Sequence, residues 1–338
     1  MSKIIKINKN SPEVSKIKLA AEVIKKGGLV AFPTETVYGL GADALNEKAV
    51  KKIFKVKGRP ADDPIIVHVA DRKELKRLAE EIPEEAEELI ERFWPGPLTL
   101  VLKKTERVPK VTTGGLETVA VRMPDNAIAL SLIKEAGTPI AAPSANLFGK
   151  PSPTSAKHVE HDLGGKVDLI IDGGSTRIGV ESTVLDVTSS PPVLLRPGGV
   201  TLEELREVVG EILLHPAVKG RASRVARAPG MKYRHYAPKA KLILVEGKPE
   251  RVRRKIQQLL KKFKSPGVIT TNEKHSYNGE VVFIGSEAKE IARNLFKVFR
   301  EFDERGVDVI LAESISETGL GLAVMNRLKK AAYKIIRA

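Results

Sequence analysis

Apolar residues recur along the chain with the two spacings that distinguish helices from strands. Residues 13–26 are apolar at helical spacing and stop at Gly27–Gly28, while residues 3–7 alternate and residues 29–32 form a short apolar run. That run leads into residues 33–41, to which no helix or strand is assigned. Further strands are predicted at 65–69, 98–103, 118–123, 139–142, 167–171, 183–187 and 193–195, and helices at 47–56, 72–93, 126–136, 155–162 and 201–213. This order predicts an α/β domain with a mixed sheet.

The composition changes after His215–Pro216. Residues 221–240 hold six Lys or Arg residues and no acidic residue, and we interpret them as a linker. Beyond it, strands are predicted at 241–245, 267–270, 281–284 and 307–311, and helices at 249–263, 287–304 and 321–336. That order predicts a small parallel α/β domain. We therefore divide the chain into residues 1–216, a basic linker at 217–239, and residues 240–338.

Composition narrows the class of protein. The 338 residues suffice for two domains, and 42% apolar with 29% charged residues argue against disorder. No apolar run is long enough for a membrane span and the first residues resemble a strand, so we expect a soluble, cytoplasmic protein with no membrane partner. The absence of cysteine excludes disulfides, thiolate zinc sites and a cysteine nucleophile. The net charge of +15 predicts an anionic partner, whether nucleotide, phosphate or nucleic acid.

Several common catalytic motifs are missing. The chain has no G-x-x-x-x-G-K-[ST] loop, no G-x-S-x-G elbow and no H-E-x-x-H pair. Gly319–Leu320–Gly321 lacks the third glycine of a dinucleotide fingerprint, which favours a tight turn over a phosphate site. His158 and His161 share a helix face, which is more often solvated than metal-binding. The residues alone therefore identify no metal site and no nucleophile motif.

What remains is a series of polar clusters at strand ends and turns, where α/β proteins bind ligands. Each cluster alone is explained by turn chemistry or by a favourable helix dipole. The clusters are Pro33–Gly39, Lys57–Arg59, Arg122, Ala141–Asn146 with the loop 149–154, and Glu181–Thr183 with Arg196–Gly199. Together they predict one basic, hydroxyl-lined cleft for an anionic small molecule.

These residues resemble the threonylcarbamoyl-AMP synthase family, which has the YrdC-like fold. The resemblance rests on residues 27–41, Lys-x-Arg at 57–59, Phe-Trp-Pro-Gly-Pro-Leu-Thr at 93–99, Ser-x-Asn at 144–146 and Leu-Arg-Pro-Gly at 195–198. Residues 229–238 and 319–328 are similar to the long, two-domain form. The resemblance implies a twisted mixed sheet around a basic cavity, with a smaller Rossmann-like domain.

The implied reaction makes L-threonylcarbamoyl-AMP and pyrophosphate from L-threonine, bicarbonate and ATP with Mg²⁺. A separate tRNA threonylcarbamoyltransferase complex, contacted transiently, would then modify adenosine 37 of tRNAs reading ANN codons. The resemblance assigns ATP and bicarbonate to Lys57, Arg59, Thr118, Ser144, Asn146, Ser152, Arg196, Tyr233 and Arg234. It assigns threonine to Thr34, Thr36, His68, Arg122, Ala142 and Ser182. For His68, which lies in an apolar run, the residues alone favour a structural role.

Three questions stay open at this point. Tyr233, Arg234 and Tyr236 form a candidate lid over the cleft, against the alternative of a solvated tether. The net charge also fits a double-stranded RNA or ribosome-associated binding protein, or weak RNA binding by an enzyme, although no aromatic-basic stripe is present. The C-terminal domain has three candidate roles, which are nucleotide binding, anchoring the lid and contacting the transferase.

A carbamoyltransferase of the same fold is disfavoured because that type carries cysteine-rich zinc fingers.

Overall fold

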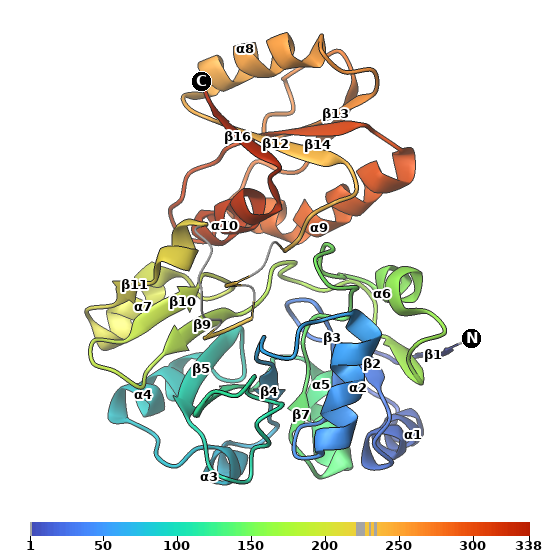
Figure 1. Ribbon diagram of the computed structural model, residues 1–338, viewed down its shortest axis with the longest axis vertical. Coiled ribbons are helices and arrows are strands. Elements are labelled where there is room, and N and C mark those ends of the chain that lie inside the picture. The colour runs from blue at the N-terminus through green and yellow to red at the C-terminus, as the bar shows by residue number, and fades with distance from the viewer. Residues whose placement is uncertain (1, 221–226, 230, 233–234) are drawn as a thin grey trace.

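Two β-sheets organise the computed structural model, which describes residues 2–220, 227–229, 231–232 and 235–338 (Figure 1). The larger sheet is mixed and has the strand order β1-β8-β2-β3-β7-β4-β6-β5-β9-β10-β11. Its strands are β1 (Lys3–Lys6), β2 (Val30–Pro33), β3 (Tyr38–Asp43), β4 (Ile66–His68), β5 (Leu98–Lys103), β6 (Thr118–Arg122), β7 (Ile140–Ala141), β8 (Leu169–Asp172), β9 (Thr183–Asp186), β10 (Val193–Arg196) and β11 (Leu213–Leu214).

Helices bury both faces of the larger sheet. On β2, Val30 and Phe32 pack with helices α1 and α5, whereas Ala31 packs on the opposite side with α2. Successive residues of a strand point to opposite faces, so a strand covered on both faces is apolar throughout. The helices of this part are α1 (Val14–Lys25), α2 (Glu47–Lys57), α3 (Leu75–Leu78), α4 (Glu84–Phe93), α5 (Ala127–Ala136), α6 (Ala156–Leu163) and α7 (Leu202–Val209), with short 3-10 turns η1 (Arg72–Glu74) and η2 (Pro216–Lys219).

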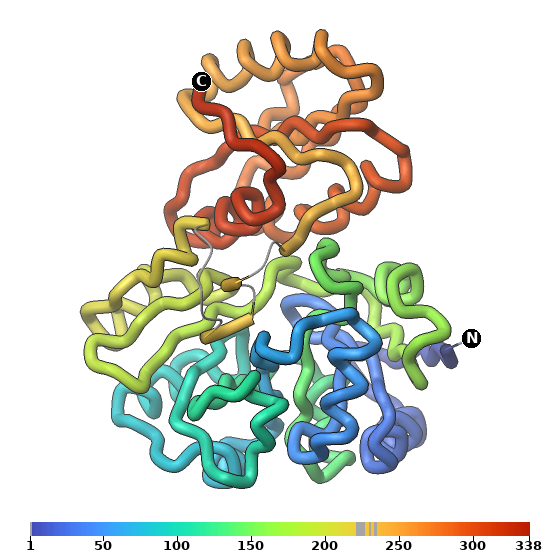
Figure 2. The backbone as a smooth tube through the Cα atoms, in the orientation of Figure 1, coloured from blue at the N-terminus to red at the C-terminus, as the bar shows by residue number. Residues whose placement is uncertain are grey.

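The smaller sheet is entirely parallel, in the order β14-β13-β15-β12-β16. Helices α9 and α10 lie between this sheet and the larger part of the molecule, and α8 lies on the outer side (Figures 1 and 2). The elements are β12 (Lys241–Glu246), α8 (Pro249–Leu260), β13 (Pro266–Thr270), β14 (Glu280–Phe283), α9 (Ala288–Arg305), β15 (Val309–Glu313), α10 (Gly321–Ala331) and β16 (Lys334–Arg337). The predicted class, a mixed α/β sheet followed by a smaller parallel one, is confirmed.

No strand is predicted within residues 33–41, but the second half of this segment belongs to strand β3. Thr34 begins a tight turn in which its hydroxyl donates to the Val37 carbonyl at 2.7 Å, and β3 then pairs antiparallel with β2. Two glycines and one alanine, Gly39, Gly41 and Ala42, weaken the strand pattern in the sequence. Tertiary pairing on both sides, with β2 and β7, supplies the stability that local propensity lacks.

Three predicted helices are shorter in the structure. The helix expected at 72–93 breaks after Leu78, where Ala79 is extended and bridges to Lys104, and Pro83 disfavours helix in the residue before it. The helix expected to reach 213 ends at Val209, before Gly210. The helix expected to reach 336 ends at Ala331, because the last residues form β16 and pair with β12.

The two sheet units pack through an apolar patch and a few buried polar contacts. Val37 and Val180 of the larger unit join the core beneath the smaller sheet, together with Phe296 of α9. Nearby, the Arg300 guanidinium of α9 lies 2.7 Å from an Asp162 carboxylate oxygen of α6, and both side chains are buried. Among the described residues, no helix combines the length and apolar character required to cross a membrane.

Gly198 permits the close approach of the turn after β10 to the start of β9. A Cβ atom on Gly198 would lie 2.3 Å from the backbone of Ser182 and Thr183, so Gly198→Ala must push the two segments apart. We expect the free energy of unfolding to fall by roughly 2–3 kcal/mol in denaturant titrations. The control is Gly306→Ala, at a left-handed position with no atom within 4 Å, for which about 1 kcal/mol is expected. Equal losses in the two variants would contradict this packing argument.

Candidate functional site

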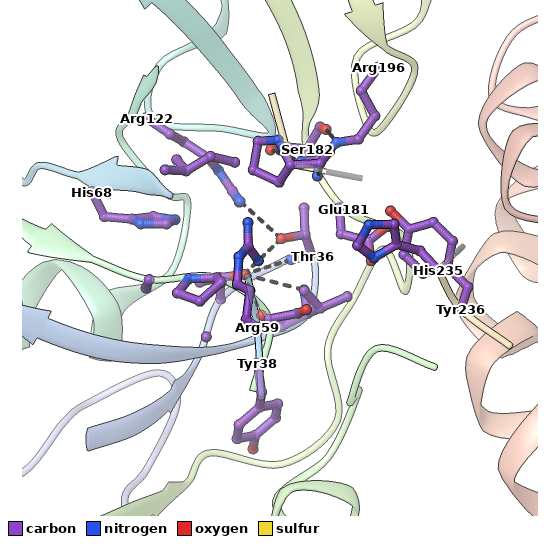
Figure 3. Close-up of a pocket in the computed structure, with 18 residues that line it drawn as sticks. Thr36, Tyr38, Arg59, His68, Arg122, Glu181, Ser182, Arg196, His235 and Tyr236 are labelled. Carbon is purple, nitrogen blue, oxygen red and sulfur yellow. Dashed lines mark hydrogen bonds between the residues drawn. The ribbon is translucent and has the colours of Figure 1, made fainter. Parts of the chain in front are cut away.

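A cavity opens where the ends of β2, β4, β6, β9 and β10 meet, on the side that faces the smaller sheet (Figure 3). Most of the side chains proposed from the sequence line it, namely Thr34, Thr36, Arg59, His68, Arg122, Ala142, Ser144, Ser182 and Arg196. These residues come from distant parts of the chain, and strand pairing brings them together. Arg59, Arg122 and Arg196 direct three guanidinium groups at one space.

Arg122, at the end of β6, is fixed in place by three contacts. Its guanidinium lies 2.5 Å from a Glu35 carboxylate oxygen and donates to the Thr36 hydroxyl at 3.0 Å and to the Gly96 carbonyl at 3.2 Å. The Thr36 hydroxyl in turn lies 2.8 Å from that of Thr34. Both partners of the ion pair are buried, so the turn between β2 and β3 holds a rigid, nearly dry cation.

Arg59 lies just beyond the end of α2, where Gly58 takes the left-handed conformation that ends the helix. Its guanidinium lies 3.0 Å from Asp63 and donates to the Pro64 carbonyl at 2.7 Å. Burial raises the pKa of Asp63, and the positive charge of Arg59 opposes that rise. The turn after the helix thus holds the Arg59 guanidinium in the cavity lining.

Lys57 has a different place from the one expected. Its ammonium is buried and donates to the carbonyls of Ser144 and Asn146, each at 2.5 Å. Burial, aided by the nearby charge of Arg59, lowers the pKa of Lys57 well below its usual value. Lys57 therefore holds the Ser144–Asn146 loop against the cavity, while it is Ser144 that lines the cavity.

Ser182 and Arg196 form the opposite wall. Arg196 donates to the Ser182 carbonyl and hydroxyl, each at 3.1 Å, and to the Pro229 carbonyl at 3.4 Å. Beside them, Glu181 accepts a hydrogen bond from the Ser152 hydroxyl. Burial favours the neutral acid, but the charges of Arg327 and Arg196 outweigh it and hold the pKa of Glu181 below its usual value. Glu181 is thus a carboxylate in the wall of a cationic cavity.

His68 lines the cavity as a neutral imidazole. Burial, and then the charge of Arg122, lowers its pKa from 6.5 to about 3. Its ring meets Phe32 edge-on at 6.4 Å, and its Nδ1 is buried with no hydrogen-bond partner among the described residues. A buried polar atom without a partner in a cavity is available to a ligand.

The linker contributes to the cavity directly. Pro229, His235 and Tyr236 line it, and the buried Tyr236 ring stacks on Phe296 of α9 at 5.4 Å between centroids. Tyr236 has φ of 66°, which is strained for a residue with a side chain. Tyr233 and Arg234, proposed from the sequence, lie outside the described residues. The described part of the linker therefore packs against the cavity.

The remaining proposed residues lie outside the described lining. Asn146 and Ser152 are buried behind the wall, where Asn146 donates to the Leu147 and Lys150 carbonyls. Thr118 begins β6, at the opposite end of that strand from Arg122. Tyr236, expected in the lid, also lines the cavity, and the lining residues to which no ligand was assigned individually are Val37, Tyr38, Gly39, Ile66, Pro143, Glu181, Pro229 and His235. Most of these residues are sequence neighbours of a recognised motif, and this is the signal by which the sequence could have identified them.

Comparison with known proteins places both parts of the chain. Residues 22–198 match a family model described as telomere recombination, and residues 200–333 match one described as the C-terminal domain of threonylcarbamoyl-AMP synthase. Relatives named threonylcarbamoyl-AMP synthase are 63% identical in Pyrococcus abyssi, over 95% of this chain and 96% of theirs, and 51% identical in Bacillus subtilis, over 96% and 94%. A crystal structure of P. abyssi Sua5 complexed with L-threonine superimposes with a TM-score of 0.95 at 61% identity, covering 99% of each chain.

The neutral state of His68 has a consequence for stability. Below pH 6.5 the unfolded chain binds a proton at this residue and the folded chain does not until about pH 3, so stability falls as the pH falls. We expect His68→Asn to reduce this dependence by about 1.4 kcal/mol per pH unit between pH 6 and 4. Denaturant titrations at several pH values measure it. The control is His161→Asn, on the exposed face of α6, for which we expect the same change of unfolding free energy with pH as in the unaltered protein. If His68→Asn also showed the pH dependence of the unaltered protein, the assignment would be refuted.

Proposed function

This chain belongs to the threonylcarbamoyl-AMP synthase family, and on that premise we propose how its cavity carries out the reaction. The enzyme makes threonylcarbamoyl-AMP, in the first step of N6-threonylcarbamoyladenosine formation in tRNA, and the RNA-binding alternative is not favoured. The observation that carries the proposal is the convergence of Arg59, Arg122 and Arg196 on one buried cavity. Bicarbonate, the carbamate and ATP are anions, and threonine carries a carboxylate, so the cationic cavity matches the charge of these groups.

We assign threonine to the side of the cavity formed by β2, β4 and β6. The Arg122 guanidinium, oriented by Glu35, would pair with the threonine carboxylate as a planar fork. Thr34 and Thr36 supply hydroxyls on this side, and Ser182 supplies one from the opposite wall. His68 offers an unpartnered ring nitrogen, and Ala142 offers backbone groups. Because His68 is neutral, it does not repel the ammonium group with which threonine enters the cavity.

We assign ATP and bicarbonate to the side formed by the end of α2, the loop after β7 and the end of β10. Arg59 and Arg196 would bind phosphate oxygens, Ser144 a further oxygen, and Lys57 would act through the loop it holds. The assignment also includes Thr118, Asn146 and Ser152, which lie outside the cavity lining and would have to move to reach the nucleotide. It includes Tyr233 and Arg234 as well, which lie outside the described residues. Magnesium would enter as part of the Mg·ATP substrate, bound by phosphate oxygens and water. The described residues contain no cluster of three or more carboxylates and histidines for it.

The chemistry then follows from positioning. The threonine amine attacks the bicarbonate carbon, and loss of water gives the carbamate. A carbamate oxygen attacks the α-phosphorus, and the bond to pyrophosphate breaks, which leaves threonylcarbamoyl-AMP. No covalent enzyme intermediate is needed, because fixed cations reduce the repulsion between the anions and hold them in line.

We further propose a cytoplasmic setting in which a tRNA threonylcarbamoyltransferase complex takes up the product, and RNA binding, if any, is weak. In this proposal residues 1–216 form the catalytic unit, residues 217–239 the linker and lid, and residues 240–338 the second unit. Pro229, His235 and Tyr236 in the cavity lining support the lid. A lid over the cavity would exclude water from the labile carbamate.

The first test is pyrophosphate release with the product mass determined. We expect release to require threonine, bicarbonate and ATP together. Arg122→Met should lower kcat/KM for threonine by roughly 30- to 100-fold, since a charge-assisted pair is lost, while Arg59→Met should act mainly on ATP. Thermal unfolding checks that each variant is folded, and Arg122→Lys tests for partial recovery. Equal effects of both variants on both substrates would contradict the assignment.

The second test concerns the lid. Because a lid would keep water from the carbamate and from newly formed threonylcarbamoyl-AMP, Tyr233→Ala/Arg234→Ala should lower the rate, as carbamate is lost before it reacts. Hydrolysis of threonylcarbamoyl-AMP should also yield more pyrophosphate per intact product. The ratio of the two products is measured by mass spectrometry and a pyrophosphate assay. Lys239→Ala removes an exposed charge from the same segment outside the cavity lining and should leave the ratio unchanged. Full activity and an unchanged ratio in the double variant would rule out the lid.

A further inference from the structure

The second unit places one fully buried arginine behind the cavity wall. Arg327 of α10 has no exposed surface and is the largest of the fully buried side chains. Helix α10 lies on the side of the smaller sheet that faces the larger unit (Figure 1). The Arg327 side chain reaches across the boundary and bonds to Glu181 and Pro197 of the larger unit. A buried guanidinium is costly unless it is paired, which makes its partners informative.

Arg327 contacts three segments of the cavity wall. Its Nε donates to a Glu181 carboxylate oxygen at 2.8 Å, and its Nη1 donates to the Pro197 carbonyl at 2.7 Å. Its guanidinium carbon lies 5.5 Å from the centre of the Tyr236 ring, within the range of a cation–π contact. Glu181 and Tyr236 line the cavity, and Pro197 follows Arg196, which also lines it.

Of these partners, Glu181 is the one whose negative charge would affect phosphate binding in the cavity. It lies beside Ser182 and faces the same cavity as Arg196, which we assigned to phosphate. An unpaired carboxylate there would repel the triphosphate and attract Arg196. With Arg327 bound to one oxygen and Ser152 donating to the other, Glu181 is satisfied from behind the wall.

We propose that Arg327 is a positioning residue for nucleotide binding: it neutralises Glu181 from outside the cavity and so leaves the Arg196 guanidinium directed at the phosphates. This inference rests on the proposed role of Arg196 in ATP binding. It gives the second unit a specific part in the reaction, through one side chain rather than through general stability. Without Arg327, Arg196 is the other arginine whose charge acts on Glu181, and pairing between them turns Arg196 away from the ligand.

The matched comparison is a second arginine that bridges the units. Arg300 of α9 is also buried, and it donates to the Asp162 carboxylate at 2.7 Å and to the Pro151 carbonyl at 2.5 Å. Neither of these partners lines the cavity. Arg300→Met therefore removes an inter-unit ion pair of the same kind without changing the charge of the wall.

The experiment measures KM for ATP and for threonine in the full-length protein, after the unaltered enzyme has been shown to form threonylcarbamoyl-AMP. That first measurement separates failure of the proposed function from failure of this inference. Arg327→Met should raise KM for ATP roughly ten- to a hundredfold and KM for threonine much less. Arg300→Met should lower the melting temperature and keep the ratio of the two KM values.

The double variant Arg327→Met/Glu181→Gln decides between charge and structure. If Arg327 acts by neutralising Glu181, removal of the carboxylate should restore KM for ATP to within about threefold of the unaltered value. If Arg327→Met is unfolded, Arg327→Lys serves instead, and its retained charge should keep KM for ATP within the same range. A double variant no better than Arg327→Met, a shift in Arg300→Met as large, or an Arg327→Lys enzyme with the full ATP defect would each overturn the proposal.

Discussion

The burial of positive charge is the constraint on which the rest of this structure depends. Arg59, Arg122 and Arg196 line one cavity and are themselves almost inaccessible. Removing a guanidinium from water costs several kcal/mol unless carboxylates or carbonyls replace the lost hydrogen bonds. Ion pairs with Asp63 and Glu35 offset this cost for the first two, and the Ser182 and Pro229 carbonyls accept hydrogen bonds from the third. The cations are thereby fixed before any ligand arrives, so binding pays little for their ordering.

This constraint explains how much of the site could be predicted from the sequence. Each cation lies in a short segment with its own signature, such as the helix end at Lys57–Arg59 or the strand end at Arg122. A strand followed by a polar turn is a local pattern, and strand ends converge in an α/β sheet. The fold class and most of the cavity lining follow from these local patterns. The two-unit architecture follows in the same way from the order of strands and helices.

The rest depends on pairing between distant residues, which no local pattern reveals. Glu181 and Arg327 are 146 positions apart, and nothing near either residue identifies the other. Lys57 resembles a phosphate ligand in its motif, yet the backbone carbonyls of the Ser144–Asn146 loop take its ammonium. Strands β3 and β16 were missed for the same reason, because their stability comes from neighbouring strands more than from their own residues. The failures are thus concentrated where tertiary contacts override local preference.

The same contacts imply that the linker and the charge of the cavity wall are coupled. Asn326, next to Arg327 on α10, donates to the carbonyls of Ala217 and Val218 where the linker begins. At the other end of the linker, Tyr236 stacks on Phe296 and lies under the Arg327 guanidinium. Movement of Tyr236 away from the cavity must break both contacts, which removes one of the groups that hold Arg327 beside Glu181. If the linker opens as proposed, its opening and the loss of the Arg327–Glu181 pair would favour each other, and the cavity would become less cationic as the anionic product leaves.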